Sequence, residues 1–194
     1  MSHSLRKFFK NTRGVASLEF VMIAPVLCLL LLGIYQYSQL VRAKAKLSSV
    51  AVSVADLVAQ QANGVTIGTG GSLGNFCKAA ELMMAPFPTG ATNTTFSLAI
   101  ASVSNYAPGT VSVDWEVDTA CTTTAPAMGA TAISLANAPV NLVPTVGDSV
   151  IMVRANYTYS SLIQYFAPAV TARTTVGFAR PRANGVVACT PACP

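Results

Sequence analysis

The sequence predicts an α+β protein in which one long N-terminal helix leads into a head with a short helix and an antiparallel sheet. Three observations support this fold class. No charged residue occurs between Phe20 and Val41, apolar residues at helical spacing continue to about Gln61, and alternating apolar residues follow in the second half of the chain. The predicted divisions are a leader over residues 1–14, a membrane span over 15–41, an amphipathic helix over 42–62 and a head over 63–194.

The uncharged run is long enough to cross a membrane. Its 22 residues cover about 33 Å as a helix, slightly more than the hydrocarbon core of a bilayer. The preceding leader contains four basic residues and no acid, so the positive-inside rule places it in the cytoplasm and the head outside. Three basic residues just beyond the span weaken this bias. The leader residues are Arg6, Lys7, Lys10 and Arg13, and the later ones are Arg42, Lys44 and Lys46.

Glu19 is the most informative residue of this region. A carboxylate inside a membrane-spanning helix is costly, so it requires a partner that neutralises it. It belongs to the segment Gly-Val-Ala-Ser-Leu-Glu-Phe, which runs from Gly14 to Phe20 between the basic leader and the apolar run.

This segment resembles the prepilin-peptidase processing site of type IV pilin-like proteins, and its Glu-Phe ending resembles the TadE/TadF pseudopilins of the tight-adherence (Flp) pilus system. The resemblance implies cleavage after Gly14 by a prepilin peptidase, which leaves Val15 as the new N-terminus and Glu19 as the fifth residue. It also implies that Glu19, followed by Phe20, fixes the register of assembly by pairing with the N-terminal amine of a neighbouring subunit. The implied partners are other pilin-like subunits and inner-membrane pilus assembly proteins. The implied location is the inner membrane, with one span, or an extracellular pilus, and the head is expected to be pilin-like.

Three other interpretations compete for the same segment. A secretory signal peptide with a small-x-small site at Ala43-Lys44-Ala45 has a shorter apolar core and no buried glutamate. A lipoprotein site at Cys28 lacks the small residues that precede such a cysteine. An inert single-span anchor leaves Glu19 without a role.

The basic charge of the chain does not indicate nucleic-acid binding. The formal net charge is +5, but four of the twelve basic residues lie in the leader. Removal of residues 1–14 leaves eight basic and seven acidic residues, a net charge of +1. No basic face remains for a phosphate backbone.

Four of the five cysteines lie beyond the span, which suggests disulfides in an oxidising periplasm. Three pairings are possible, and the preferred one joins Cys77 to Cys121 and Cys189 to Cys193, because the last two close a short loop. A zinc site is the alternative, although structural zinc sites usually have two close cysteine pairs and only the terminal pair here is close.

The head begins with a Gly-rich segment over residues 64–74, which is predicted to be a flexible link. Asn75 is predicted to cap a short helix that ends before Pro86 and carries Phe76, Ala79, Ala80 and Met83 on one side. The following residues predict an antiparallel hairpin that turns at Pro108-Gly109. One strand face carries Phe96, Leu98 and Ile100, and the other carries Val111, Val113, Trp115 and Val117.

The remaining chain is less uniform. Residues 119–147 are rich in Ala, Thr and Pro without a sustained period, so they are predicted to form a functional or partly mobile loop. Ser149 to Tyr159 predicts a strand buried on both faces, Ser161 to Phe166 a single helical turn, and Thr171 to Ala179 a final strand.

Enzymatic function is not expected, and no motif predicts a cofactor. The single histidine, His3, lies in the leader. Asp114, Glu116 and Asp118 are a weak candidate for a Ca²⁺ site, because a straight strand places them about 7 Å apart on one face, and a solvated face explains them better.

The sequence therefore favours a minor pilin-like subunit that acts in assembly of a tight-adherence pilus. The alternative is a membrane-anchored periplasmic domain that uses the Ala/Thr/Pro-rich loop for binding or adhesion. The two differ in whether Val15 is the mature N-terminus.

Overall fold

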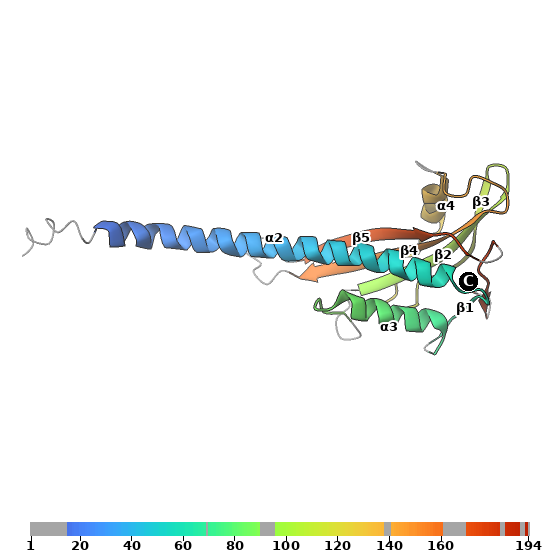
Figure 1. The fold of residues 1–194 in the computed structure, drawn as a ribbon, viewed down its shortest axis with the longest axis horizontal. Coiled ribbons are helices and arrows are strands. Elements are labelled where there is room, and N and C mark those ends of the chain that lie inside the picture. The colour runs from blue at the N-terminus through green and yellow to red at the C-terminus, as the bar shows by residue number, and fades with distance from the viewer. Residues whose placement is uncertain are drawn as a thin grey trace, which may run out of the picture.

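The structure is a computed structural model that describes residues 15–68, 70–89, 96–137, 141–160, 170–182, 185–190 and 193. Its longest element is helix α2, Val15–Ala59, whose N-terminal half extends away from the head and whose C-terminal half packs against it (Figure 1). The long helix, the shorter helices and the antiparallel sheet confirm the predicted α+β class.

Helix α2 is continuous from the predicted span into the head. The helix passes through Pro25 without interruption. It ends at Ala59, two residues before the predicted end, and the chain reverses at Gly64, whose φ of +82° lies in the left-handed region that glycine tolerates.

The head contains a four-stranded antiparallel sheet in the order β3-β2-β4-β5. Strands β2 and β3 form the predicted hairpin, which turns at Pro108-Gly109, and β4 and β5 confirm the last two predicted strands. The strand bounds are β2 Phe96–Ala107, β3 Thr110–Val117, β4 Ser149–Ser160 and β5 Val170–Ala179. The helical turn predicted for Ser161 to Phe166 lies outside the described residues.

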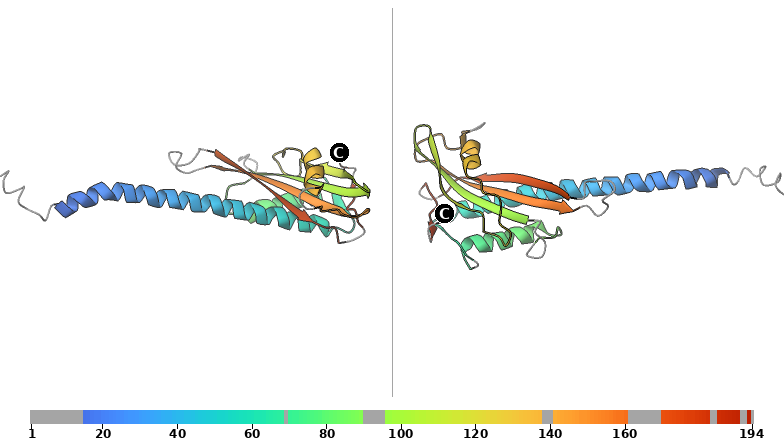
Figure 2. Two further views of the ribbon diagram at one scale, coloured as in Figure 1. Left: turned by 90° about the horizontal axis from the view of Figure 1, so that it is seen from above. Right: turned by 180° about the vertical axis from the view of Figure 1, so that it is seen from behind.

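Helices cover both faces of this sheet (Figure 2). On one face, α2 and α3 enclose the larger core, which includes Leu98, Ile100, Ile151 and Val153. On the other face, α4 covers a smaller core that includes Val103 and other residues of β2 and β4. Strand β4 therefore has apolar residues on both faces, as its sequence predicted.

A bulge in β3 contradicts the prediction of one continuous apolar strand face. Trp115 pairs with Ser102 and Val113 pairs with the next residue, Val103, so Asp114 is the extra residue. Trp115 consequently packs in the larger core, whereas Val113 packs against the smaller one. Alternation alone assigned both residues to one face because it cannot detect an inserted residue.

The Gly-rich connector is more ordered than predicted. Its first residues form the short strand β1, Val65–Thr66, which pairs in parallel with β6, Cys189–Thr190. Helix α3, Ser72–Met84, begins three residues before the predicted cap because Thr66 and Ser72 exchange backbone-to-hydroxyl hydrogen bonds of 2.8 and 2.9 Å. The buried face of α3 is formed by Leu73, Cys77, Ala80 and Met84. Of the predicted set, Ala80 is buried and Phe76 packs against the larger core, whereas Ala79 and Met83 are not buried.

The Ala/Thr/Pro-rich region also contains an element that the sequence did not predict. Helix α4, Ala130–Asn137, buries Ala132 and Ala136 against the sheet. Its sequence is too short and too rich in small residues to produce a clear helical period, so the prediction of an unstructured loop over all of residues 119–147 was wrong.

Candidate functional site

The N-terminal half of α2 is an exposed apolar surface. Large apolar side chains from Leu18 to Ile34 are 42–72% exposed on all sides of the helix. Among the described residues, one helix is long and apolar enough to cross a membrane, and it is this one. The finding is compatible with a single-pass membrane anchor.

The predicted processing and register residues lie at the start of this helix. Gly14 itself is outside the described residues, and Val15 is the first residue of α2. Glu19 is exposed and lies four residues after Val15, which places both residues on one helix face about one turn apart. Phe20 is 68% exposed beside it. The carboxylate therefore lies close to the end of the helix and is accessible to a group from another molecule.

A shallow apolar depression lies further along the same helix. It surrounds Gly33, where an added Cβ would meet no atom within 4 Å. Small residues of this kind let membrane helices approach one another closely. The lining residues are Val26, Leu29, Leu30, Gly33, Ile34 and Tyr37.

The anchor and the head are joined through direct packing of α2. The head begins to cover the helix at Gln36, which is 6% exposed, and Leu40 packs against the larger core. Further along, a Cβ at Gly177 of β5 would lie 2.5 Å from the carbonyl oxygen of Ala51 and 2.6 Å from the nitrogen of Val52. The backbone of β5 therefore touches the backbone of α2, and a side chain at position 177 is sterically excluded.

Both disulfides of the preferred pairing are present. Cys77 of α3 is bonded to Cys121, with 5.4 Å between the Cα atoms, and the bond fastens the helix to the segment after β3. Glu81 lies next to this bridge, and the three residues are close enough to form a metal-ligand group. Sulfur atoms that are bonded to each other are not thiolates, so this group is not a metal site in the disulfide form.

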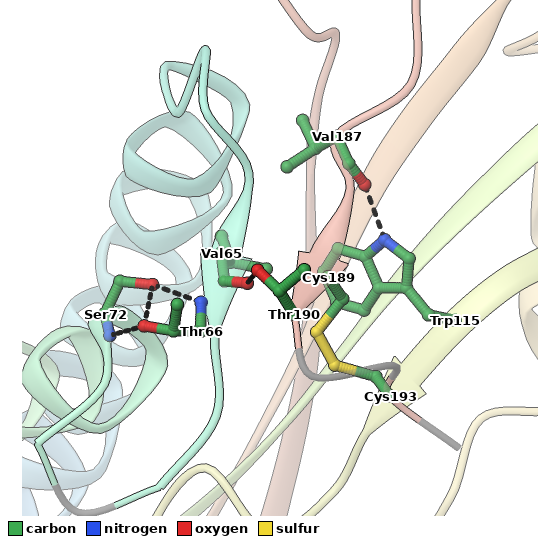
Figure 3. The surroundings of a disulfide bond; sticks show 8 residues. All are labelled: Val65, Thr66, Ser72, Trp115, Val187, Cys189, Thr190 and Cys193. Carbon is green, nitrogen blue, oxygen red and sulfur yellow. Dashed lines mark hydrogen bonds between the residues drawn. A yellow bond between two sulfur atoms is a disulfide. The ribbon is translucent and has the colours of Figure 1, made fainter.

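The second disulfide closes the C-terminal segment beside the sheet (Figure 3). Cys189 and Cys193 are bonded, and their Cα atoms are 5.7 Å apart. In the same region, the indole N–H of Trp115 donates a 2.6 Å hydrogen bond to the carbonyl of Val187. These contacts, with the β1-β6 pair, hold the end of the chain against the end of the head where α2 finishes.

Asp114 and Glu116 of β3 do not form a common site with Asp118, which follows the strand. Asp114 accepts hydrogen bonds of 2.8, 2.6 and 2.6 Å from Ser102, Ser104 and Tyr106. The hydrogen bond from Tyr106 to Asp114 raises the pKa of Tyr106, because the neutral hydroxyl is the donor.

Glu116 instead accepts the backbone N–H groups of Met128 and Gly129, immediately before α4. The expectation that Asp114, Glu116 and Asp118 form one solvated face was therefore wrong. The bulge turns Asp114 towards the buried serines, and Glu116 stabilises the start of α4.

Comparison with known protein families finds a similarity in the N-terminal region. Residues 14–56 are similar to the model of the family described as TadE-like protein. The match spans both the exposed half of α2 and most of the half that packs in the head, and it supports a pilin-like protein associated with Tad pili. No curated protein and no solved structure matched the chain.

Two positions that matter for this arrangement were missed by sequence reasoning. Gly177 interrupts a strand rich in β-branched residues, and an isolated glycine in such a strand is a signal of close backbone approach. Glu116 was assigned to solvent because its partners are backbone groups twelve and thirteen residues away, which no side-chain pattern reveals.

Proposed function

We propose that this TadE-like protein is a minor pilin-like subunit needed for assembly of a tight-adherence (Flp) pilus. A prepilin peptidase would cut it after Gly14 on the cytoplasmic side, and the head would lie in the periplasm. Its work is assembly rather than catalysis, and its partners are other pilin-like subunits and inner-membrane pilus assembly proteins.

The observation that carries the proposal is the combination at the start of α2. The TadE-like match includes Gly14, the helix begins at Val15, and Glu19 lies one turn further on an otherwise apolar surface. Cleavage before Val15 creates a positively charged amine at the end of this helix. A carboxylate one turn away in a neighbouring subunit is then a suitable partner, because each charge compensates the other outside water.

The exposed half of α2 supports the same proposal. A helix that is apolar on all sides requires lipid or other helices around it, and the depression at Gly33 offers a place where a second helix backbone can approach. A bundle of parallel pilin-like helices satisfies both requirements.

The test is the mass of the N-terminal peptide from membranes and from sheared pili. Processing predicts Val15 as the first residue, and Gly14→Arg should leave a chain longer by 14 residues. If the Gly14→Arg variant still begins at Val15, the cleavage site is wrong. An unprocessed wild-type protein in cells with an active peptidase favours the alternative of an anchored binding domain.

Glu19 is tested separately from cleavage. Glu19→Ala should be cut normally but should not co-purify with partner subunits, whereas Glu19→Asp, which keeps the charge, should retain part of the association. Normal pilus formation by Glu19→Ala contradicts the register role.

A further inference from the structure

The junction between the anchor and the head carries basic residues that assembly through Glu19 does not explain. Arg42 and Lys44 are exposed, and Lys46 is half-buried and donates a hydrogen bond to the carbonyl of Ala85. No acidic residue occurs between Glu19 and Asp56. The three side chains are called the basic collar here.

The basic collar lies on both sides of the helix beside its contact with the head. At about 100° per residue, Arg42 and Lys46 lie on one side of α2 and Lys44 lies on the other. The buried stripe that includes Ala43 and Leu47 runs between Lys46 and Lys44. Lys44 and Lys46 therefore flank the contact with the head, and Arg42 faces away from it.

The height of the basic collar matches the headgroup layer of a bilayer. The uncharged run ends at Val41, so the three Cα atoms lie about 2, 5 and 8 Å beyond it along the helix. The polar layer on each side of the hydrocarbon core is about 5–8 Å thick. Long basic side chains at this level reach lipid phosphates while their aliphatic parts remain against apolar surface.

The head extends past this layer towards the hydrocarbon core. It already covers Gln36, five residues before the uncharged run ends at Val41, and it packs against Leu40. Tyr159 of β4 lies close to Tyr35 of α2, and Phe87 packs edge-on against Tyr159 with ring centroids 6.4 Å apart. No polar neck separates the span from the head.

We propose that the basic collar binds the phosphate groups of anionic phospholipids in the leaflet on the head side of the membrane, so that the junction between anchor and head is held at the headgroup layer. This inference rests on the proposed membrane insertion but not on cleavage or pilus assembly. Each basic residue at an anionic surface contributes ~1 kcal/mol, which is about fivefold in relative lipid affinity. Movement of the subunit out of the membrane would have to break these contacts.

The experiment uses the full chain reconstituted in phosphatidylcholine vesicles with spin-labelled phosphatidylglycerol or spin-labelled phosphatidylcholine. The fraction of immobilised label measures the relative association of each lipid with the protein. The wild type should prefer phosphatidylglycerol severalfold. Arg42→Gln/Lys44→Gln should lose a large part of that preference, and the four basic residues of the leader supply the remainder. Lys46 is left unchanged because it also bonds to the head. The matched control is Lys78→Gln/Arg182→Gln, which removes the same charge from exposed positions away from the junction and should keep the preference.

Three outcomes overturn the proposal. They are equal association of both lipids with the wild type, an equal loss in the control variant, and loss of the preference when inorganic phosphate is added at unchanged ionic strength. The last outcome would assign the basic collar to free anions rather than lipid. Because the peptide mass at the N-terminus is measured independently, failure of the lipid preference does not affect the processing proposal, and failure of processing does not affect the lipid preference.

Discussion

The two halves of helix α2 both contain many apolar residues but have opposite surroundings. Leu30 in the first half is 59% exposed, whereas Leu47 in the second half is 1% exposed. In the first half apolar residues occupy every side of the helix. In the second half small and apolar residues form one stripe, and polar residues such as Ser49 and Ser53 occupy the other side.

This difference shows that the distribution of apolar residues, and not only their number, determines the partner of a helix. A helix that is apolar all round requires lipid or other membrane helices, and a helix with one apolar stripe packs on a protein core. The boundary lies between Tyr35 and Leu40, where the head begins to cover α2.

The largest difference between the two halves is expected when one glycine is replaced by valine in each environment. Gly177 of β5 lies against the second half of α2, and Gly33 lies in the first half. Gly177→Val should prevent the head from packing on α2, because the new side chain meets the backbone of Ala51 and Val52. Overpacking of this kind typically costs 1–3 kcal/mol and more when the obstacle is backbone. Gly33→Val adds the same atoms in open space and should leave the head unchanged. The measurement is the melting temperature followed by Trp115 fluorescence. Equal melting temperatures for the two variants would contradict the close contact.

The two disulfides of the head are expected to contribute unequally to its stability. The chain-entropy model assigns roughly 4 kcal/mol to the Cys77–Cys121 bridge, whose residues are 44 positions apart. The Cys189–Cys193 bridge spans four positions and should contribute much less. Cys77→Ser should therefore lower protein levels in an oxidising compartment far more than Cys193→Ser, with neither change affecting cleavage after Gly14. Non-reducing peptide mapping gives the pairing, and a Cys77 to Cys189 link would contradict both statements.

Much of this architecture was predictable because its signals are local. The uncharged run, the helical stripe, the alternation in β2 and the apolar residues of β4 each involve residues that are close in sequence. Apart from α4, whose own sequence gives a weak signal, the main features that were missed depend on distant partners. The bulge at Asp114 depends on the register with Ser102 and Val103, and β1 depends on residues more than 120 positions away.

The candidate site shows the same division. Glu19 could be recognised from its own surroundings, because a carboxylate in an apolar helix is informative by itself. Gly177 could not be assigned a role, because the reason for it is the backbone of Ala51 on another element. A glycine in a strand indicates close approach but does not name what approaches.

A smaller and cleaner comparison replaces leucine by alanine in each half. Leu47→Ala should destabilise the head by about 3 kcal/mol, as expected for a large side chain removed from a packed core. Leu30→Ala should not change the melting temperature of the head, since its side chain contacts lipid or neighbouring helices. A decrease in both variants would mean that the two halves unfold together, and the stated boundary between them would be wrong.

The smallest effect concerns the tyrosines at the boundary itself. Burial, and secondarily the neighbouring Tyr35, raises the pKa of Tyr159 above its ordinary value of 10.0. The folded state therefore holds the phenolic proton more tightly than the unfolded state, and the resulting stability is fully present below pH 10 and is lost as the pH rises through the folded pKa.

Tyr159→Phe should remove part of this alkaline loss, while Tyr157, whose pKa burial also raises, keeps its own contribution. The measurement is the melting temperature of each variant from about pH 8 to about pH 11, a range that brackets tyrosine ionisation. An identical alkaline decrease in the wild type and in Tyr159→Phe would mean that Tyr159 is not buried at the junction with α2. The boundary between the two halves of the helix would then lie closer to Leu40.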